Sequence, residues 1–153
     1  MKKEKTIDAL NTLVEINNDR VKGYEKAFEN TEERDLKDLF STFEKTSHKC
    51  LGELISEINK LGGKATDGTN TSGKFFRTWM DVKSALTGKD RKAILNSCEH
   101  GEESADETYQ TVLEDESEHL NPQQQSMIES QHNLLLADQS KIKSMLNTLV
   151  EAP

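Results

Sequence analysis

Apolar side chains recur every three or four residues over four long stretches of this chain, and this spacing constrains the fold more than any other feature. Such spacing is typical of one face of an α-helix, and its sustained alternation gives the seam along which long helices pack. No stretch of useful length alternates apolar and polar residues, so we expect no β-sheet. The sequence predicts an all-α fold with helices over residues 7–29, 32–61, 90–116 and 122–150.

Residues that favour helix ends support these boundaries. Thr6 is suited to cap the first helix and Thr31 the second. Gly62-Gly63 predicts the end of the second helix, and Pro122 suits the first turn of the last helix. The links within the first pair and within the last pair of helices are short, so each pair is expected to be antiparallel. The seam of the first helix is predicted to pass through Val14, Asn17, Val21, Tyr24 and Phe28.

The connection between the second and third helices is much longer. Residues 62–89 are enough to cross the full length of a helical bundle and return to its starting end, which would make these two helices parallel. The glycine-rich residues 62–74 favour a loop, and an amphipathic stretch over 74–87 predicts a short extra helix. One long crossover is the ferritin-like arrangement of a four-helix bundle, and we expect a single such domain over residues 1–153.

Composition narrows the classes of function and location. The chain has 28 acidic and 20 basic residues, and its net charge of −8 argues against general nucleic-acid binding, which needs a basic surface. No stretch approaches the roughly 20 apolar residues of a membrane span, and the N-terminal residues lack the apolar core of a signal peptide. Cys50 and Cys98 belong to no paired motif and are expected to be buried, reduced thiols. These features predict a cytoplasmic protein.

Four polar side chains fall on the predicted seams, one on each helix: Asn17, Ser47, Glu102 and Asp138. Counted from the two short links, all four lie within about one turn of the middle of the bundle, and Gln131 lies about two turns from Asp138 on the same face. Buried carboxylates are costly unless they are paired. We therefore expect an interior polar layer that fixes the helix register, in which one of Glu102 and Asp138 holds a proton and donates it to the other.

A ferritin-like fold raises the question of a di-iron site. Such sites take a Glu from each of two helices and a Glu-x-x-His pair from each of the other two. The one match, Glu129 with His132, lies about 100–160° around the helix from its apolar centre, so both side chains are expected to face solvent. The prediction is no cofactor. The alternative is an iron, manganese or zinc site on the interior carboxylates Glu102 and Asp138.

The predicted crossover is basic and aromatic. Residues 74–92 contain six basic and two acidic side chains, a local charge of +4. The group formed by Phe75, Phe76, Arg77 and Trp79 is suited to contact a protein partner or, less favourably, a membrane surface. The competing interpretation, which we favour, packs the rings onto the bundle with Trp79 as the main anchor and leaves the basic groups in water.

Several of these segments resemble one known family. They are residues 76–79 (FRTW), 83–90 (KSALTGKD) and 99–103 (EHGEE), together with Gly23-Tyr24, Ala27, Glu53-Leu54 and Leu61-Gly62-Gly63. In this pattern the chain is similar to a bacterial family of ferritin-like four-helix-bundle proteins of unknown function, whose third helix carries an Arg-Gly-Glu-Asp signature. Phe76 stands where members usually carry His, and His100 where they carry Arg. The resemblance implies the ferritin-like fold and no known activity.

No motif of a nucleotide-binding loop, a hydrolase or a zinc protease occurs in the chain. The sequence therefore favours a non-enzymatic protein that works by interaction, as in a stress response, with a protein partner or as a homo-oligomer. The alternative is a metal-binding or oxidoreductase ferritin-like protein that uses the interior carboxylates.

Overall fold

The computed structural model describes residues 2–67 and 91–151. Within these residues the chain forms four long α-helices, one short 3₁₀ helix and no strand. The elements are α1 (Lys2–Asn30), α2 (Arg34–Lys60), α4 (Arg91–Asp115), η1 (Ser117–His119) and α5 (Pro122–Glu151). The all-α prediction is confirmed. None of the helices in the described part is long and apolar enough to cross a membrane.

Local signals explain where the helices end. Gly62 has a φ of 79°, its N–H donates to the Asn59 carbonyl, and the Gly63 N–H donates to the Ile58 carbonyl, which is the usual glycine-terminated end of a helix. At the start of α5, Asn121 and Gln124 each accept a hydrogen bond from the backbone N–H of the other, at 2.8 and 2.9 Å. Pro122 is the first residue of α5, as predicted.

The predicted cap at Thr6 is wrong. Helix α1 already begins at Lys2, so Thr6 lies within the helix. Its side chain is buried, and its hydroxyl donates to the carbonyls of Lys2 and His119. The predicted cap at Thr31 is also wrong, because α2 begins at Arg34 and Glu33 occupies its N-cap position; the Thr31 hydroxyl accepts a hydrogen bond from the Glu33 N–H at 3.3 Å.

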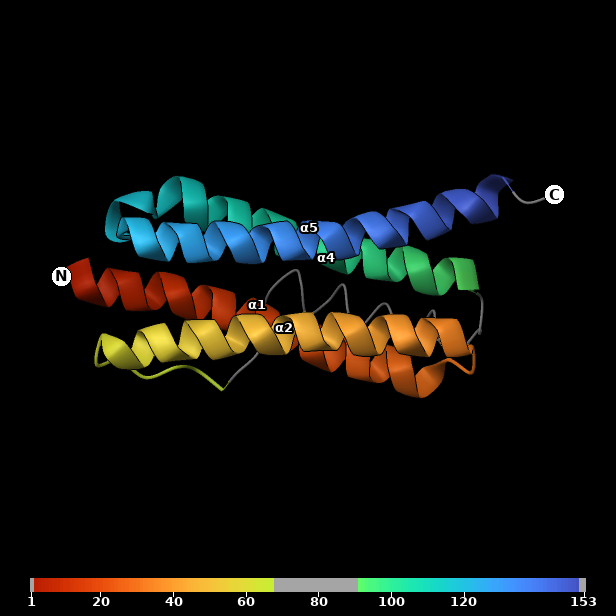
Figure 1. Cartoon of the computed structure of the whole chain (residues 1–153), viewed down its shortest axis with the longest axis horizontal. Helices are drawn as coiled ribbons and strands as arrows, with labels where there is room; N and C mark the ends of the chain where they lie inside the picture. Colours follow the sequence, from red (N-terminus) through yellow and green to blue (C-terminus); the bar gives the residue numbers. More distant parts are fainter. Residues whose placement is uncertain (1, 68–90, 152–153) are drawn as a thin grey trace.

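The helices form two antiparallel pairs, here called the N-hairpin (α1 and α2) and the C-hairpin (α4, η1 and α5), which lie side by side (Figure 1). Helix α1 packs on α4, and α5 packs on α2. The Arg91 guanidinium, at the start of α4, donates to Glu33 at 3.1 Å and to Asp35 at 2.6 Å, at the start of α2. Helices α2 and α4 therefore begin at the same end and run parallel.

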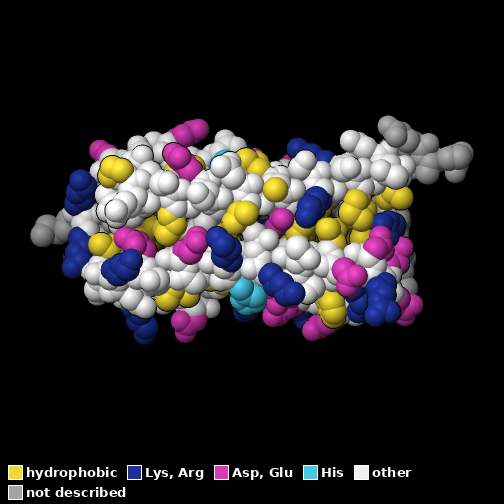
Figure 2. Space-filling model, in the orientation of Figure 1, with side chains coloured by type: hydrophobic (Ala, Val, Ile, Leu, Met, Phe, Trp, Pro, Cys, Tyr) yellow, Lys and Arg dark blue, Asp and Glu magenta, His cyan; other side chains and the backbone are white. Residues whose placement is uncertain are grey.

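The core runs lengthwise between the hairpins and is apolar toward both ends. Leu10, Leu13 and Leu54 are fully buried toward one end, and Phe40 and Leu95 toward the other. Figure 2 shows acidic and basic side chains spread over one face of the molecule, with apolar side chains gathered along the line between the two hairpins. This packing leaves the middle of the core to polar side chains.

The interior face of α1 differs from the predicted seam. Arg20 is fully buried, whereas Val21 is half-buried; Ala27 is buried, whereas Phe28 is 39% exposed. The Phe28 ring lies instead under the Lys37 ammonium, 4.3 Å from its centroid. The seam assignment of Val21 and Phe28 is therefore wrong, because the buried face of α1 lies one residue earlier at these two turns.

Candidate functional site

A fully buried arginine lies at the middle of the structure. The guanidinium of Arg20, on α1, donates from Nε to Glu102 Oε1 at 2.8 Å and from Nη2 to Glu102 Oε2 at 3.1 Å. Nη2 also donates to Asp138 Oδ2 at 3.2 Å, and Nη1 donates to Ser47 Oγ at 2.5 Å. One cation thus joins residues of all four long helices, and we call Arg20, Ser47, Glu102, Asp138 and Tyr24 the Arg20 cluster.

Tyr24 completes the cluster from the next turn of α1. Its hydroxyl donates to Glu102 Oε1 at 2.9 Å, and its ring centroid lies 5.3 Å from the Arg20 guanidinium carbon. The ring is held by Phe40 and Phe43 of α2, at centroid distances of 5.7 and 5.4 Å. The carboxylate of Glu102 therefore accepts three hydrogen bonds, two of them from the guanidinium, which is the geometry in which a buried charge pair can be tolerated.

The charges of the cluster depend on this geometry. Burial alone would lower the pKa of the Arg20 guanidinium, but the nearby charges, Glu102 foremost, raise it, so Arg20 is a cation. Burial raises the pKa of the Asp138 carboxyl. The positive charge of Arg20 lowers this pKa and the negative charge of Glu102 raises it, so that the pKa of Asp138 is raised overall. Asp138 lies at the more open edge of the cluster, with 8% of its side chain exposed, whereas 1% of the Glu102 side chain is exposed.

A second polar group lies beside the cluster along the helix axes. Asn17 Nδ2 donates to the Tyr109 hydroxyl at 2.8 Å, and this hydroxyl donates to Gln131 Oε1 at 2.8 Å. Gln131 Nε2 in turn donates to Glu53 Oε1 at 3.0 Å, on α2. We call these four residues the Tyr109 chain. Every member except Glu53 is fully buried.

The structure buries all five residues of the predicted interior polar layer: Asn17, Ser47, Glu102, Asp138 and Gln131. It divides them between two groups, because Ser47, Glu102 and Asp138 surround Arg20, whereas Asn17 and Gln131 meet through Tyr109. The predicted sharing of a proton between Glu102 and Asp138 is replaced by a shared cation, since both carboxylates accept hydrogen bonds from Arg20.

Sequence reasoning missed Arg20, although a signal for it was present. Arg20 lies three residues after Asn17 and four before Tyr24, so it shares their helix face. Two interior carboxylates also require a compensating charge. Hydropathy alone favoured the neighbouring Val21 for the interior.

A di-iron or similar metal site does not fit these residues. The lone pairs of Glu102 and Asp138 that would face a metal ion accept hydrogen bonds from a fixed cation. Among the residues that the structure describes, no three His, Cys, Asp or Glu side chains gather in a way that could hold a metal ion. At the alternative site on Glu102 and Asp138, the carboxylates already pair with Arg20, and no third side chain of these types gathers with them among the described residues.

The Glu129 and His132 pair also does not point inward together. Glu129 is exposed, as expected. His132 is not solvated as expected: only 14% of its side chain is exposed, because the imidazole lies 2.5 Å from Asp106 of α4 and stacks on the Tyr109 ring. It belongs to the contact between α4 and α5, away from the Arg20 cluster.

The two cysteines are buried free thiols, as predicted. Burial raises the pKa of Cys50 to about 11, and burial next to Glu102 raises the pKa of Cys98 further. Neither thiol has the lowered pKa of a reactive cysteine. The proposed crossover contact of Phe75, Phe76, Arg77 and Trp79 lies outside the described residues.

Comparison with known families identifies residues 5–115 as a match to a family model described as a domain of unknown function (DUF2383). The chain belongs to the DUF2383 family. The matched range contains Arg20, Tyr24, Ser47 and Glu102 and ends with α4, so α5, which supplies Asp138 and Gln131, lies beyond the DUF2383 match. No curated protein and no solved structure matches the chain.

Asp138 gives the cluster a predicted pH dependence. Because its pKa is raised in the folded state, its contribution to stability is fully present below the ordinary value of 3.8 and is lost as the pH rises through the raised value. Asp138→Asn keeps an oxygen for Arg20 and removes this titration. We expect the stability of the native chain relative to Asp138→Asn to fall as the pH rises from 4 to 8, measured by urea unfolding. A difference that stays constant or grows with pH would contradict this assignment.

Proposed function

We propose that the chain is a single ferritin-like four-helix-bundle domain, with the residues between α2 and α4 as its long crossover, and that it acts without catalysis, through interaction with a partner. The parallel direction of α2 and α4 supports this fold, since a crossover must join them from opposite ends. We also propose that this interaction serves a stress response. The partner is another protein or a second copy of the chain.

One observation carries the non-enzymatic interpretation: the guanidinium of Arg20 takes the central position between the interior carboxylates. In a ferritin-like oxidoreductase, inward carboxylates and imidazoles bind metal ions at this depth. Here a side-chain cation pairs with both carboxylates instead, and it carries no open coordination position for oxygen or a substrate. In this proposal the Arg20 cluster holds the helices in register, and the function is performed by the surface of the molecule.

The surface that we propose for contact is the basic and aromatic crossover, with Phe75, Phe76, Arg77 and Trp79 as the contacting residues. Its sequence supports this proposal through its combination of large rings and positive charge on an otherwise acidic chain. We propose a cytoplasmic location because Cys50 and Cys98 are free thiols, which suit a reducing compartment.

Metal content tests this function. The full chain, purified without chelator, is analysed for iron, manganese and zinc by elemental mass spectrometry. We expect far less than one metal ion per chain, because Arg20 already pairs with both carboxylates. Stoichiometric metal that disappears in Glu102→Gln would overturn the proposal and favour the metal-binding or oxidoreductase alternative.

A further inference from the structure

The charges of the Arg20 cluster are divided between the two hairpins. The N-hairpin contributes the cation Arg20, and the C-hairpin contributes the two carboxylates, Glu102 and Asp138. All the ionic contacts of the Arg20 guanidinium therefore run from one hairpin to the other. The hydrogen bond from Arg20 to Ser47 stays within the N-hairpin and orients the guanidinium toward its partners.

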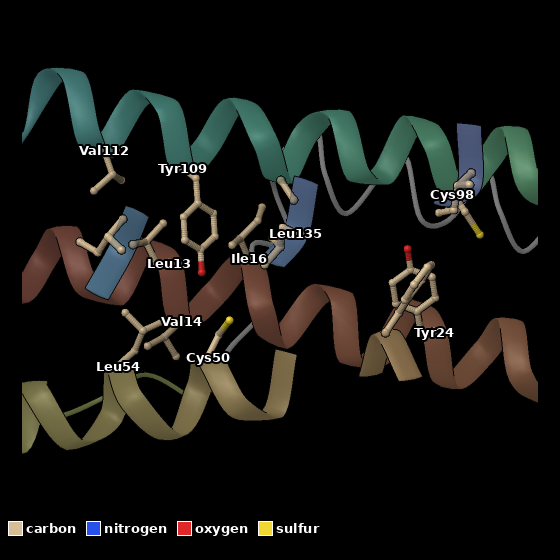
Figure 3. Close-up of a cluster of buried hydrophobic side chains, with 14 of the residues drawn as sticks. Leu13, Val14, Ile16, Tyr24, Cys50, Leu54, Cys98, Tyr109, Val112 and Leu135 are labelled. Atoms are coloured by element: carbon tan, nitrogen blue, oxygen red, sulfur yellow. The ribbon is translucent and has the colours of Figure 1, made fainter. Parts of the chain in front are cut away.

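The hydrogen bonds of the two buried tyrosines also run from one hairpin to the other. Tyr24 of the N-hairpin donates to Glu102, and Tyr109 of the C-hairpin accepts from Asn17. Figure 3 shows the two tyrosines pointing across the interface in opposite directions, Tyr24 from α1 toward α4 and Tyr109 from α4 toward α1. Each hairpin thus presents hydrogen-bonding groups that are satisfied by the other.

Helix α5 repeats this pattern at positions seven residues apart. Gln124 donates to Glu57 at 3.1 Å, Gln131 donates to Glu53 at 3.0 Å, and Asp138 accepts from Arg20 at 3.2 Å. All three α5 side chains are buried. A seven-residue repeat follows a single line along a helix that packs lengthwise, so these contacts fix the register of α5 on the N-hairpin.

We propose that the two hairpins are complementary recognition units and that the interaction partner of the chain is a second copy, which exchanges its C-hairpin to form a swapped dimer. This inference rests on the proposed interaction function and names a second copy of the chain as its partner. The contact in the swapped dimer is the interface between the hairpins, in addition to the crossover surface proposed above. In the swapped dimer, each N-hairpin meets the C-hairpin of the other copy through the same contacts as in the single chain.

The charges decide which pairings are possible. Two N-hairpins would bring two Arg20 guanidinium groups together without the carboxylates of Glu102 and Asp138, and two C-hairpins would bring four of these carboxylates together without the guanidinium. Buried charges without their partners are costly, so both pairings are disfavoured. The native contacts form only between unlike hairpins, either within one chain or between two chains.

The protein concentration determines whether the hairpins pair within one chain or between two chains. The 30 residues from 61 to 90 join the hairpins and can extend to roughly 100 Å, more than twice the length of about 40 Å expected for α2. A covalent link of this length holds its ends at an effective concentration on the order of 1 mM. The closed single chain therefore dominates when the protein is dilute, and the swapped dimer forms when chains fold together at comparable concentration.

Two variants of the full chain test the exchange. Arg20→Glu places a carboxylate on the N-hairpin, and Glu102→Arg places a cation on the C-hairpin, so each variant alone is mismatched. When the two are unfolded and refolded together, a mixed swapped dimer restores one native pairing and one reversed pairing. We expect a species of twice the chain mass by sedimentation, containing both variants, with a thermal midpoint above that of either alone. A mixture in which each variant keeps its own mass and midpoint would overturn the proposal.

A second measurement covers variants that fail to fold. Tagged and untagged native chains are unfolded together, refolded at millimolar concentration and then diluted. We expect dimers that contain one chain of each kind, and chains that stay monomeric after this treatment would contradict the exchange. As a control, the surface variants Arg91→Glu and Asp35→Arg are mixed in the same way and should give no mixed dimer beyond that of the native chain. None of these results depends on metal content, so the exchange and the proposed non-enzymatic function fail separately.

Discussion

Replacing Arg20 with methionine should destabilise the fold by about 3–5 kcal/mol, the cost of breaking a buried ion pair by removing one partner. Methionine fills much of the same space, so the loss reports the charge and the hydrogen bonds more than a cavity. It leaves Glu102 and Asp138 buried together without a cation. Urea unfolding at neutral pH, with the midpoint and slope compared with those of the native chain, measures the effect.

Arg91→Met is the matched control for this prediction. Arg91 also pairs with two carboxylates, those of Glu33 and Asp35, but its side chain is 27% exposed and theirs are more so. Because water screens exposed ion pairs, we expect a loss of about 0–1 kcal/mol. Equal losses for Arg91→Met and Arg20→Met would show that burial of the Arg20 cluster has no special effect on stability.

Glu102→Leu should cost about 3 kcal/mol, because it removes the main partner of a buried cation. The substitution leaves Arg20 with Asp138 as its one remaining carboxylate and deprives the Tyr24 hydroxyl of its acceptor. Leucine is a good helix former, so the helix propensity of α4 is not reduced. Thermal and urea unfolding both measure the loss.

The neighbouring residue Glu103 provides the control for Glu102→Leu. Glu103 is also on α4, but its side chain is 55% exposed, so Glu103→Leu should change stability by less than about 0.5 kcal/mol. If Glu102→Leu proves as neutral as Glu103→Leu, the buried network does not hold the fold together.

The helices could be predicted because their signals are local. Three- and four-residue spacing identifies the buried face, and Gly62-Gly63 and Pro122 lie where α2 ends and α5 begins. The sequence predicts Glu102 and Asp138 to be interior residues because each lies on a mainly apolar line of its helix. These inferences need only the residues of one helix at a time.

The partners within the site could not be predicted in the same way, because they depend on how neighbouring helices are rotated and shifted. Arg20 and Val21 lie about 100° apart on α1, and hydropathy favours Val21 for the interior. The ionic contacts that favour Arg20 come from α4 and α5, more than 80 residues away in the chain. His132 was misjudged for the same reason, since Asp106 and the Tyr109 ring of α4 shield it from solvent.

A double-mutant cycle on Arg20 and Glu102 tests the central claim, that a buried cation and its carboxylates form one coupled unit. Once both are replaced, by Arg20→Met and Glu102→Leu, Asp138 can hold a proton because burial already raises its pKa. The double variant should then recover much of the loss, with a coupling energy of at least about 2 kcal/mol from urea unfolding. Losses that simply add, with a coupling energy near zero, would contradict this account of the interior.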